Sequence, residues 1–217
     1  LTTSTGGISI STSTLTFDAN NWNSAKTVTV TAIDDVIAQA THTAVVTLTS
    51  SSTNFGYNPV ALPNSYVTGT AIDNDTAGVT VTESGGTTNV TEGGSTDSYT
   101  VVLTSQPTST VEIIFSTSTL GVTLSTSTIS FSSDNWNAAQ TVTVSATNDS
   151  TDEPSPHTST VTHAASSTNY GYTSALSISS VTANITDNDA AGLTLSKDYT
   201  TSTEGGSTDS FTVLLNT

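Results

Sequence analysis

Residues 131–146 read FSSDNWNAAQTVTVSA, and residues 17–32 read FDANNWNSAKTVTVTA. The two stretches share a Phe, a Trp-Asn pair and the run Thr-Val-Thr-Val at an offset of 114 positions (131 minus 17). Val and Thr alternate in this run, and a period of two residues is typical of a β-strand with one buried face. A long repeat that carries strand patterns predicts tandem all-β domains with a unit of about 114 residues.

Two further matches extend the repeat to other parts of the chain. The tripeptide Asp73-Asn74-Asp75 returns as Asp187-Asn188-Asp189 at the same offset. The segment 92–99 returns as 204–211, so a third unit has begun before the last residue. The sequence therefore contains parts of three units.

The register of these matches places the unit boundaries. We expect residues 1–76 to be the later two-thirds of one unit, 77–190 to be a complete unit and 191–217 to open the next. The ends of the chain then cut across the repeat, which fits a stretch of a longer tandem array. The alternative is a fibre, in which the C-terminal strands of one chain complete the N-terminal unit of the next. The expected partners are accordingly neighbouring repeats, or identical chains placed head to tail.

The complete unit holds eight short candidate strands that are separated by turn residues such as Gly and Pro. They span residues 79–81, 97–104, 111–116, 121–124, 128–131, 141–146, 158–163 and 179–186. The apolar side chains of several strands share one face, as in Tyr99, Val101 and Leu103; Val111, Ile113 and Phe115; and Val142, Val144 and Ala146. Such faces pack together between two sheets, so the sequence predicts an immunoglobulin-like Greek-key β-sandwich.

Two tryptophans occupy matching places in the repeat. Trp136 lies between the strand that ends at Phe131 and the strand that starts at Thr141, and Trp22 has the equivalent place in the first unit. An indole combines a large apolar body with one N–H donor. We therefore expect each tryptophan to close the end of a core, with its N–H donating to a backbone carbonyl.

The composition is rich in hydroxyl groups and acidic. Ser and Thr make up 85 of 217 residues, Cys is absent, and the formal net charge is −16. Nucleic acids and anionic membranes bind basic surfaces, so this charge argues against both as partners and favours cations. No stretch approaches the ~18 consecutive apolar residues of a membrane span, and the first residues carry no signal segment. We expect an extracellular or cell-surface location, with any export signal outside this sequence.

Residues typical of catalysis are sparse. His42 and His157 are equivalent in the repeat, and each begins a strand after an acidic loop, which favours a structural role. Ser, His and Asp occur together by composition alone in such a chain, so they do not indicate a catalytic triad. Phosphate-binding loops, paired zinc ligands and nucleotide-binding motifs are absent from the sequence. We expect no enzymatic activity.

The order of the motifs resembles a known family. Thr91-Glu92-Gly93-Gly94 is followed by Phe131, by the strand and acidic residues of 141–149, and by Ile185-Thr186-Asp187-Asn188-Asp189. This order is similar to that of the Calx-beta type of immunoglobulin-like repeat, above all in the long arrays of secreted and surface-attached bacterial proteins. The resemblance covers the whole chain and implies a tandem β-sandwich fold.

The resemblance also implies calcium ligands in the loops at one end of each sandwich. In the complete unit these are Glu92, Asp149, Asp152, Glu153, Asp187 and Asp189, with Glu83 as a second candidate for the first ligand. In the first unit they are Asp34, Asp35, Asp73 and Asp75. Ca²⁺ binds six to eight oxygen ligands, and carboxylates that converge repel one another unless a cation lies among them.

The two units differ within this pattern. Asn148 stands where the first unit has Asp34, and the first unit has Val-Ile-Ala-Gln at 36–39 where the complete unit has Ser-Thr-Asp-Glu at 150–153. The first unit therefore lacks two of the acidic residues. We expect its calcium site to be the weaker of the two.

These observations favour a structural spacer, which is a stalk or filament shaft of an extracellular or cell-surface bacterial protein, stiffened by calcium at its junctions. An alternative is an adhesin module that binds a glycan or protein through its loops. The aromatic residues that would stack on sugars in that case are Phe55, Tyr57, Tyr170 and Tyr172. Their recurrence in both units favours packing over binding.

Overall fold

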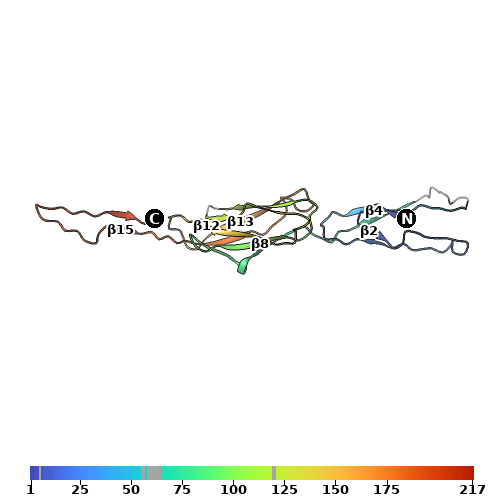
Figure 1. Cartoon of the computed structure of the whole chain (residues 1–217), viewed down its shortest axis with the longest axis horizontal. Coiled ribbons are helices and arrows are strands. Elements are labelled where there is room, and N and C mark those ends of the chain that lie inside the picture. The colour runs from blue at the N-terminus through green and yellow to red at the C-terminus, as the bar shows by residue number, and fades with distance from the viewer. Residues whose placement is uncertain (5, 55–56, 58–64, 119–120) are drawn as a thin grey trace.

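The computed structural model describes residues 1–4, 6–54, 57, 65–118 and 121–217. The chain forms an elongated molecule in which groups of strands follow one another along the long axis (Figure 1). The most extensive group lies in the middle, and the C-terminal strands lie on the opposite side of it from the N-terminal strands. No helix among the described residues is long and apolar enough to cross a membrane.

The middle group is a sandwich of two sheets. The four-stranded sheet has the order β10 (Val122–Leu124), β12 (Gln140–Ala146), β8 (Asp97–Leu103) and β6 (Val79–Glu83). The five-stranded sheet has the order β11 (Thr128–Phe131), β9 (Val111–Thr117), β13 (His157–Ser166), β14 (Val181–Thr186) and β7 (Thr88–Thr91). From β6 to β13 consecutive strands alternate between the two sheets, and β13 and β14 then pair within the five-stranded sheet. The predicted all-β sandwich of immunoglobulin-like type is confirmed.

All eight predicted strands are present, but the sequence did not predict β7. This short strand follows the 3₁₀ turn η1 (Ser84–Gly86) and pairs in parallel with β14, whereas the other pairings in the sandwich are antiparallel. A parallel pair joins segments that are distant in the sequence, so no local hairpin signal announces it. β7 matters for the site described below because Glu92 directly follows its last residue, Thr91.

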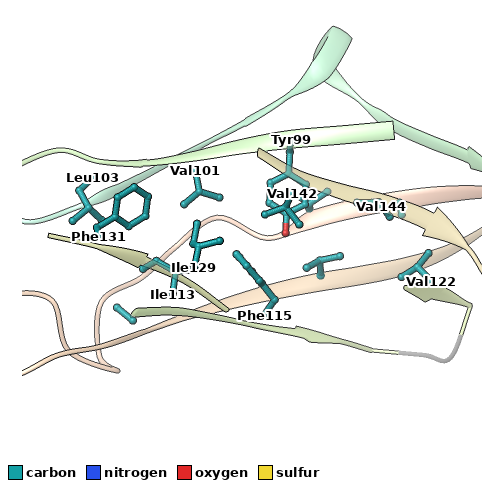
Figure 2. Packing of buried hydrophobic residues seen from close by; sticks show 14 of the residues in the cluster. Tyr99, Val101, Leu103, Ile113, Phe115, Val122, Ile129, Phe131, Val142 and Val144 are labelled. Carbon is teal, nitrogen blue, oxygen red and sulfur yellow. The ribbon is translucent and has the colours of Figure 1, made fainter. Parts of the chain in front are cut away.

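The core lies between the two sheets. Tyr99, Val101 and Leu103 of β8 face Ile113 and Phe115 of β9 across it (Figure 2). The predicted inward faces are confirmed, with Val142 and Val144 fully buried and Ala146 partly buried. The alternate positions of β12 are Thr141, Thr143 and Ser145, which keep this part of the outer face hydrated, whereas β9 exposes Glu112 and Ile114.

Smaller sheets lie on either side of the sandwich. The N-terminal residues form a three-stranded sheet of β1 (Thr2–Thr3), β4 (His42–Thr47) and β5 (Tyr66–Ala71), and a pair of β2 (Ile8–Ile10) and β3 (Val30–Ala32). The C-terminal residues form a pair of β15 (Leu193–Leu195) and β16 (Val213–Leu215). These sheets fall within the three expected units, and the unit boundaries themselves stay a prediction.

The two tryptophans differ in their surroundings, which corrects the prediction for Trp22. Trp136 is partly buried against the core, and its carbonyl oxygen accepts a hydrogen bond of 3.1 Å from the Leu103 amide at the end of β8. Trp22 is 72% exposed. The described N-terminal sheets contain no strand equivalent to β8, so Trp22 has no core edge to close.

His163 on β13 packs its ring edge-on against Tyr99 and Phe115. Its Nδ1 lies 2.6 Å from the Ser179 carbonyl oxygen, and its Nε2 lies 3.2 Å from the Tyr99 hydroxyl. Burial lowers the pKa of His163, against a smaller opposite effect of the Ser179 carbonyl, and burial raises the pKa of Tyr99. The sandwich therefore holds His163 in its neutral form.

We expect the stability of the sandwich to fall as the pH drops below about 6.5, the ordinary pKa of histidine. In that range the unfolded chain binds a proton at residue 163 more readily than the folded chain, so the free energy of unfolding decreases with decreasing pH. Urea unfolding between pH 7 and pH 5 measures this slope. His163→Gln keeps a polar side chain without the titration and should flatten the slope, and an unchanged slope in this variant would contradict the assignment to His163.

Candidate metal centres

Three acidic loops meet at one end of the complete sandwich. Glu92 follows β7, Asp149 follows β12, and Asp187 and Asp189 follow β14, while Glu153 precedes β13. The strands that lead into these loops are paired in the two sheets, so they bring together residues from distant parts of the sequence. Carboxylate oxygens of Glu92, Asp149 and Asp189 lie within 4.8 Å of one another. Ligands at this spacing fit a single cation.

Glu92 is held in place from both sides. Its amide donates to the Thr186 carbonyl oxygen at 3.0 Å, and its own carbonyl oxygen accepts from the Asn188 side chain at 3.0 Å. The next residue, Gly93, has a φ of +58°, and a Cβ there would lie 2.6 Å from the Asn148 side-chain oxygen. The backbone after Glu92 thus requires glycine, and the turn directs the carboxylate inward.

The Glu92 side chain is the most buried acid of the sandwich, at 3% exposed. Its Oε2 is buried without a hydrogen-bond partner among the described residues, and the same is true of Oδ2 of Asp189. Burial raises the pKa of Glu92, and the negative charges of Asp187, Asp149 and Glu153 raise it further. A backbone hydrogen bond from Asp149 lowers the pKa of Glu92 by less than these effects raise it. A buried carboxylate that is surrounded by carboxylates and has one oxygen without a donor is costly unless a cation binds it.

Asp187 has a different role from its neighbours. Its Oδ2 accepts from the Glu153 amide at 2.9 Å, and its Oδ1 accepts from the Asp189 amide at 3.1 Å. These backbone donors, the Glu153 amide first, lower the pKa of Asp187. Both oxygens therefore help to fix the loops that carry Glu153 and Asp189, and Asp187 lies outside the groups of converging ligand atoms among the described residues.

The structure separates the other predicted ligands. Asp152 is exposed and belongs to none of the groups of converging ligand atoms among the described residues. Glu83 also lies outside these groups, and its Oε2 accepts from the Thr88 hydroxyl at 2.8 Å. Glu92 is accordingly the better placed of the two candidates for the first ligand.

The N-terminal unit contains a second acidic group. Oxygens of Asp35, Asp73 and Asp75 lie within 4.8 Å of one another. Oδ2 of Asp75 is buried without a hydrogen-bond partner among the described residues, and burial followed by the charges of Asp73, Asp34 and Asp35 raises the pKa of Asp75. A cavity of about 460 Å³ lies beside the group, and Gln39 contributes to its lining.

The two groups share their supporting hydrogen bonds. The Gln39 amide donates to Asp73 Oδ2 at 2.7 Å, as the Glu153 amide does to Asp187. Asn74 donates its side-chain N–H to Asp34 Oδ1 at 3.1 Å, which matches the 3.0 Å bond from Asn188 to Asn148. Asp34 and Asn148 therefore accept equivalent hydrogen bonds, and Asp34 lies outside the group of Asp35, Asp73 and Asp75.

The acidic groups of the two units differ in one residue, Glu92. In the complete unit β7 covers the edge of β14 and ends in Glu92, whereas β5 is the edge strand of its sheet among the described residues. The described part of the first unit thus has no counterpart of Glu92 beside Asp35, Asp73 and Asp75. The expectation that the first site is the weaker of the two stays a prediction.

One residue of the complete site was missed by sequence reasoning. His157, the first residue of β13, places its Nε2 3.2 Å from Glu153 Oε2 and forms a group of converging ligand atoms with Glu153 and Glu92. The sequence indicates only that a histidine starts the strand after the acidic loop. Its proximity to Glu92 depends on β7, which the sequence did not predict.

Comparisons with known proteins give little guidance to function. No family model matches the chain, and no curated protein matches it. Among solved structures the chain is similar to the D00-D0 domain of Intimin, with 18% identity over 82% of this chain and 76% of that chain. The TM-score is 0.31, so this likeness carries no argument about what the chain does.

Proposed function

We propose that the chain is a structural spacer, a series of β-sandwiches in a stalk or filament shaft of an extracellular or cell-surface bacterial protein. In this proposal calcium binds the acidic groups at the ends of the sandwiches and fixes each unit against the next. The chain is not an enzyme, and its units are Calx-beta-type repeats. The acidic residues in three loops at one end of the sandwich support the assignment of calcium.

The observation that carries the proposal is the position of the first acidic group at the junction between units. Asp35 is followed by Val36, whose carbonyl oxygen accepts a hydrogen bond of 2.7 Å from the Gln106 amide of the complete unit. Asp75 is followed by Thr76, whose carbonyl oxygen accepts from the Thr104 hydroxyl at 2.8 Å. Two of the three candidate ligands therefore each adjoin a residue that contacts the next unit.

The complete unit packs closely around residues 76–78, the segment that joins it to the first unit. The Thr104 amide donates to the Gly78 carbonyl oxygen at 2.9 Å, and a Cβ on Gly171 would lie only 2.4 Å from the Ala77 side chain. Gly171 has a φ of +80°, a conformation that side chains disfavour, so glycine is needed both for the turn and for the close approach. The joining segment therefore contacts two loops of the complete unit, one at Thr104 and one at Gly171.

Tyr172 fixes the loop that contains Ser105 through hydrogen bonds to its backbone. Its fully buried hydroxyl donates to the Ser105 carbonyl oxygen at 2.9 Å and accepts from the Ser105 amide at 3.1 Å. This pair fixes the backbone between Thr104 and Gln106, the two residues that contact the preceding unit. A cation that draws Asp35 and Asp75 together would therefore be coupled to the orientation of the next sandwich.

The alternative of an adhesin that binds ligands through aromatic loop residues receives less support. Tyr172 is fully buried and cannot stack on a sugar, which corrects its inclusion among the candidate contacts. Tyr57 and Tyr170 are exposed, and Phe55 lies outside the described residues. The equivalent residues of the two units thus do not form one repeated aromatic surface.

We expect calcium to narrow the range of distances between adjacent units. The chain has no native cysteine, so Ser24→Cys in the first unit and Thr123→Cys in the complete unit can carry a pair of spin labels, both at exposed positions. Pulsed electron resonance should give a narrower distance distribution in excess calcium than in excess chelator. Asp75→Asn should remove the effect, because it takes a charge from the group at the junction.

The matched control is Glu112→Gln, which removes an exposed carboxylate of β9 outside both groups. This variant should respond to calcium as the parent chain does. If Glu112→Gln abolishes the narrowing, the effect arises from overall charge and not from the site. If Asp75→Asn retains it, the first group does not control the junction.

A further inference from the structure

The complete unit places a nitrogen ligand beside the acidic group, and the described part of the first unit has no such arrangement. His157 Nε2, a Glu153 oxygen and a Glu92 oxygen lie within 4.8 Å of one another. Glu92 also belongs to the group of Asp149 and Asp189, so its carboxylate stands between an all-oxygen group and a mixed group. A carboxylate has two oxygens, and it can contact a different cation with each.

Both ring nitrogens of His157 face oxygen atoms. Its Nδ1 is 3.2 Å from the Pro154 carbonyl oxygen, which can only accept, so a hydrogen bond between them requires the tautomer with hydrogen on Nδ1. Nε2 is 3.2 Å from Glu153 Oε2, which is also an acceptor. In that tautomer the lone pair of Nε2 points toward the carboxylate, and a metal ion between the two atoms is held by both.

The distances and burial fit a metal ion. Ligand atoms about 2.0–2.1 Å from a tetrahedral ion such as Zn²⁺ lie about 3.3 Å apart, which is close to the separation of Nε2 and Oε2. A carbonyl that accepts from the other ring nitrogen is the usual partner of a metal-binding histidine, since it fixes the ring and leaves Nε2 free to ligate. The third ligand, Glu92, is 3% exposed and has an oxygen without a donor among the described residues.

We propose that Glu92, Glu153 and His157 form a site for a first-row transition ion of the Zn²⁺ class. An imidazole nitrogen suits such ions, whereas Ca²⁺ takes oxygen ligands, so this site and the proposed calcium group differ in selectivity. The inference shares Glu92 with the proposed calcium group, and it assigns Glu153, one of the calcium ligands that the resemblance implies, to the transition ion. Three protein ligands leave a fourth position of a tetrahedral ion open to water or to a group from a neighbour.

The first unit supplies a natural comparison. His42 occupies the place of His157, and its Nδ1 likewise faces a carbonyl, that of Ala40, at 3.4 Å. Gln39 stands in the place of Glu153 and donates its side-chain N–H to Asp35 at 3.1 Å. A donor there cannot ligate a metal through that nitrogen, so the first unit should lack the transition-ion site although it has the histidine.

The test is calorimetric titration of Zn²⁺ into the intact chain in the presence of excess calcium, which occupies the all-oxygen groups. The expected result is one Zn²⁺ per chain, with the affinity lowered at least about tenfold by His157→Gln and by Glu153→Gln, since even indirect partners of metal ligands have effects of that size. The matched variant His42→Gln should bind Zn²⁺ as the parent chain does. Calcium affinity, measured separately, should be unchanged in His157→Gln.

Spectroscopy on the parent chain keeps the test independent of whether a variant folds. Zn²⁺ should shift the nuclear resonance of the His157 Nε2 and leave those of His42 and His163 unchanged. Absence of Zn²⁺ binding, equal binding by His157→Gln, or a shift at His42 instead would each show that His157 and Glu153 form only an ion pair. If the parent chain bound Zn²⁺ but no calcium, the proposed function would be contradicted and this inference would stand.

Discussion

Glu92→Gln should abolish the stabilisation of the complete unit by calcium and should make the metal-free protein more stable at neutral pH. A ligand at 100 times its dissociation constant adds about 2.7 kcal/mol to the free energy of unfolding, and the variant should lose that increment. Glutamine keeps the size of the side chain but removes the buried charge. The metal-free variant should be the more stable one because burial and the nearby acids raise the pKa of Glu92 in the parent chain.

The raised pKa of Glu92 determines how its charge affects the free energy of unfolding. A carboxyl group whose pKa is higher in the folded state than in the unfolded state contributes stability below its unfolded pKa, and this contribution is lost as the pH rises through the folded value. The stability that protonation of Glu92 contributes to the metal-free protein therefore declines as the pH rises. Glu92→Gln should flatten the dependence of stability on pH in excess chelator, and calcium should have the same effect on the parent chain by neutralising the group.

Urea unfolding followed by the fluorescence of Trp136 measures this effect for the complete unit alone. Trp22→Phe makes Trp136 the sole tryptophan, because the chain contains two. Glu112→Gln is the control for a change of net charge by one at an exposed position. If calcium shifted the unfolding midpoint of Glu92→Gln as far as that of the parent chain, Glu92 would not be a ligand.

Phe131→Ala should lower the free energy of unfolding of the complete unit by about 3–5 kcal/mol, the cost of removing a buried aromatic side chain. Phe131 is fully buried beside Leu103 in the core (Figure 2). Its counterpart in the repeat, Phe17, is 51% exposed, and its ring lies 5.1 Å from the Lys26 ammonium. Phe17→Ala should therefore change the Trp136 unfolding transition by less than about 0.5 kcal/mol, as surface substitutions do.

The same Trp136 assay compares the two variants. Since a loss of this size is a large share of the stability of a domain, Phe131→Leu provides a milder change that keeps most of the apolar volume. Its effect should fall between those of the parent chain and Phe131→Ala. Equal effects of Phe17→Ala and Phe131→Ala would contradict the described difference in burial between the two positions.

The fold could be predicted from the sequence because its signals are local. Alternation of Val and Thr identifies β12, and the inward positions of β8 and β9 follow from the same period of two. β7 could not be predicted, since four residues that include Asn89 carry little periodicity and its partner β14 is distant in the sequence. The exposure of Trp22 was missed because the repeat pattern does not report which strands surround a residue.

The candidate site could be predicted only as a set of loops. The resemblance to Calx-beta repeats predicts that Glu92, Asp149 and Asp189 lie at one end of a sandwich, but it does not distinguish a ligand from a supporting residue. Asp187 accepts from backbone amides with both oxygens, and Asp152 is exposed and lies outside the groups among the described residues, although the motif treats them like their neighbours. His157 was hidden because a histidine at the start of a strand has no pattern of its own.

The central claim is that calcium between Asp35, Asp73 and Asp75 fixes one sandwich against the next. The distribution of distances between spin labels at Ser24→Cys and Thr123→Cys measures that directly, because the labels lie on opposite sides of the junction. The account predicts a narrower distribution in excess calcium than in excess chelator. Distributions of equal width in the two conditions would contradict it.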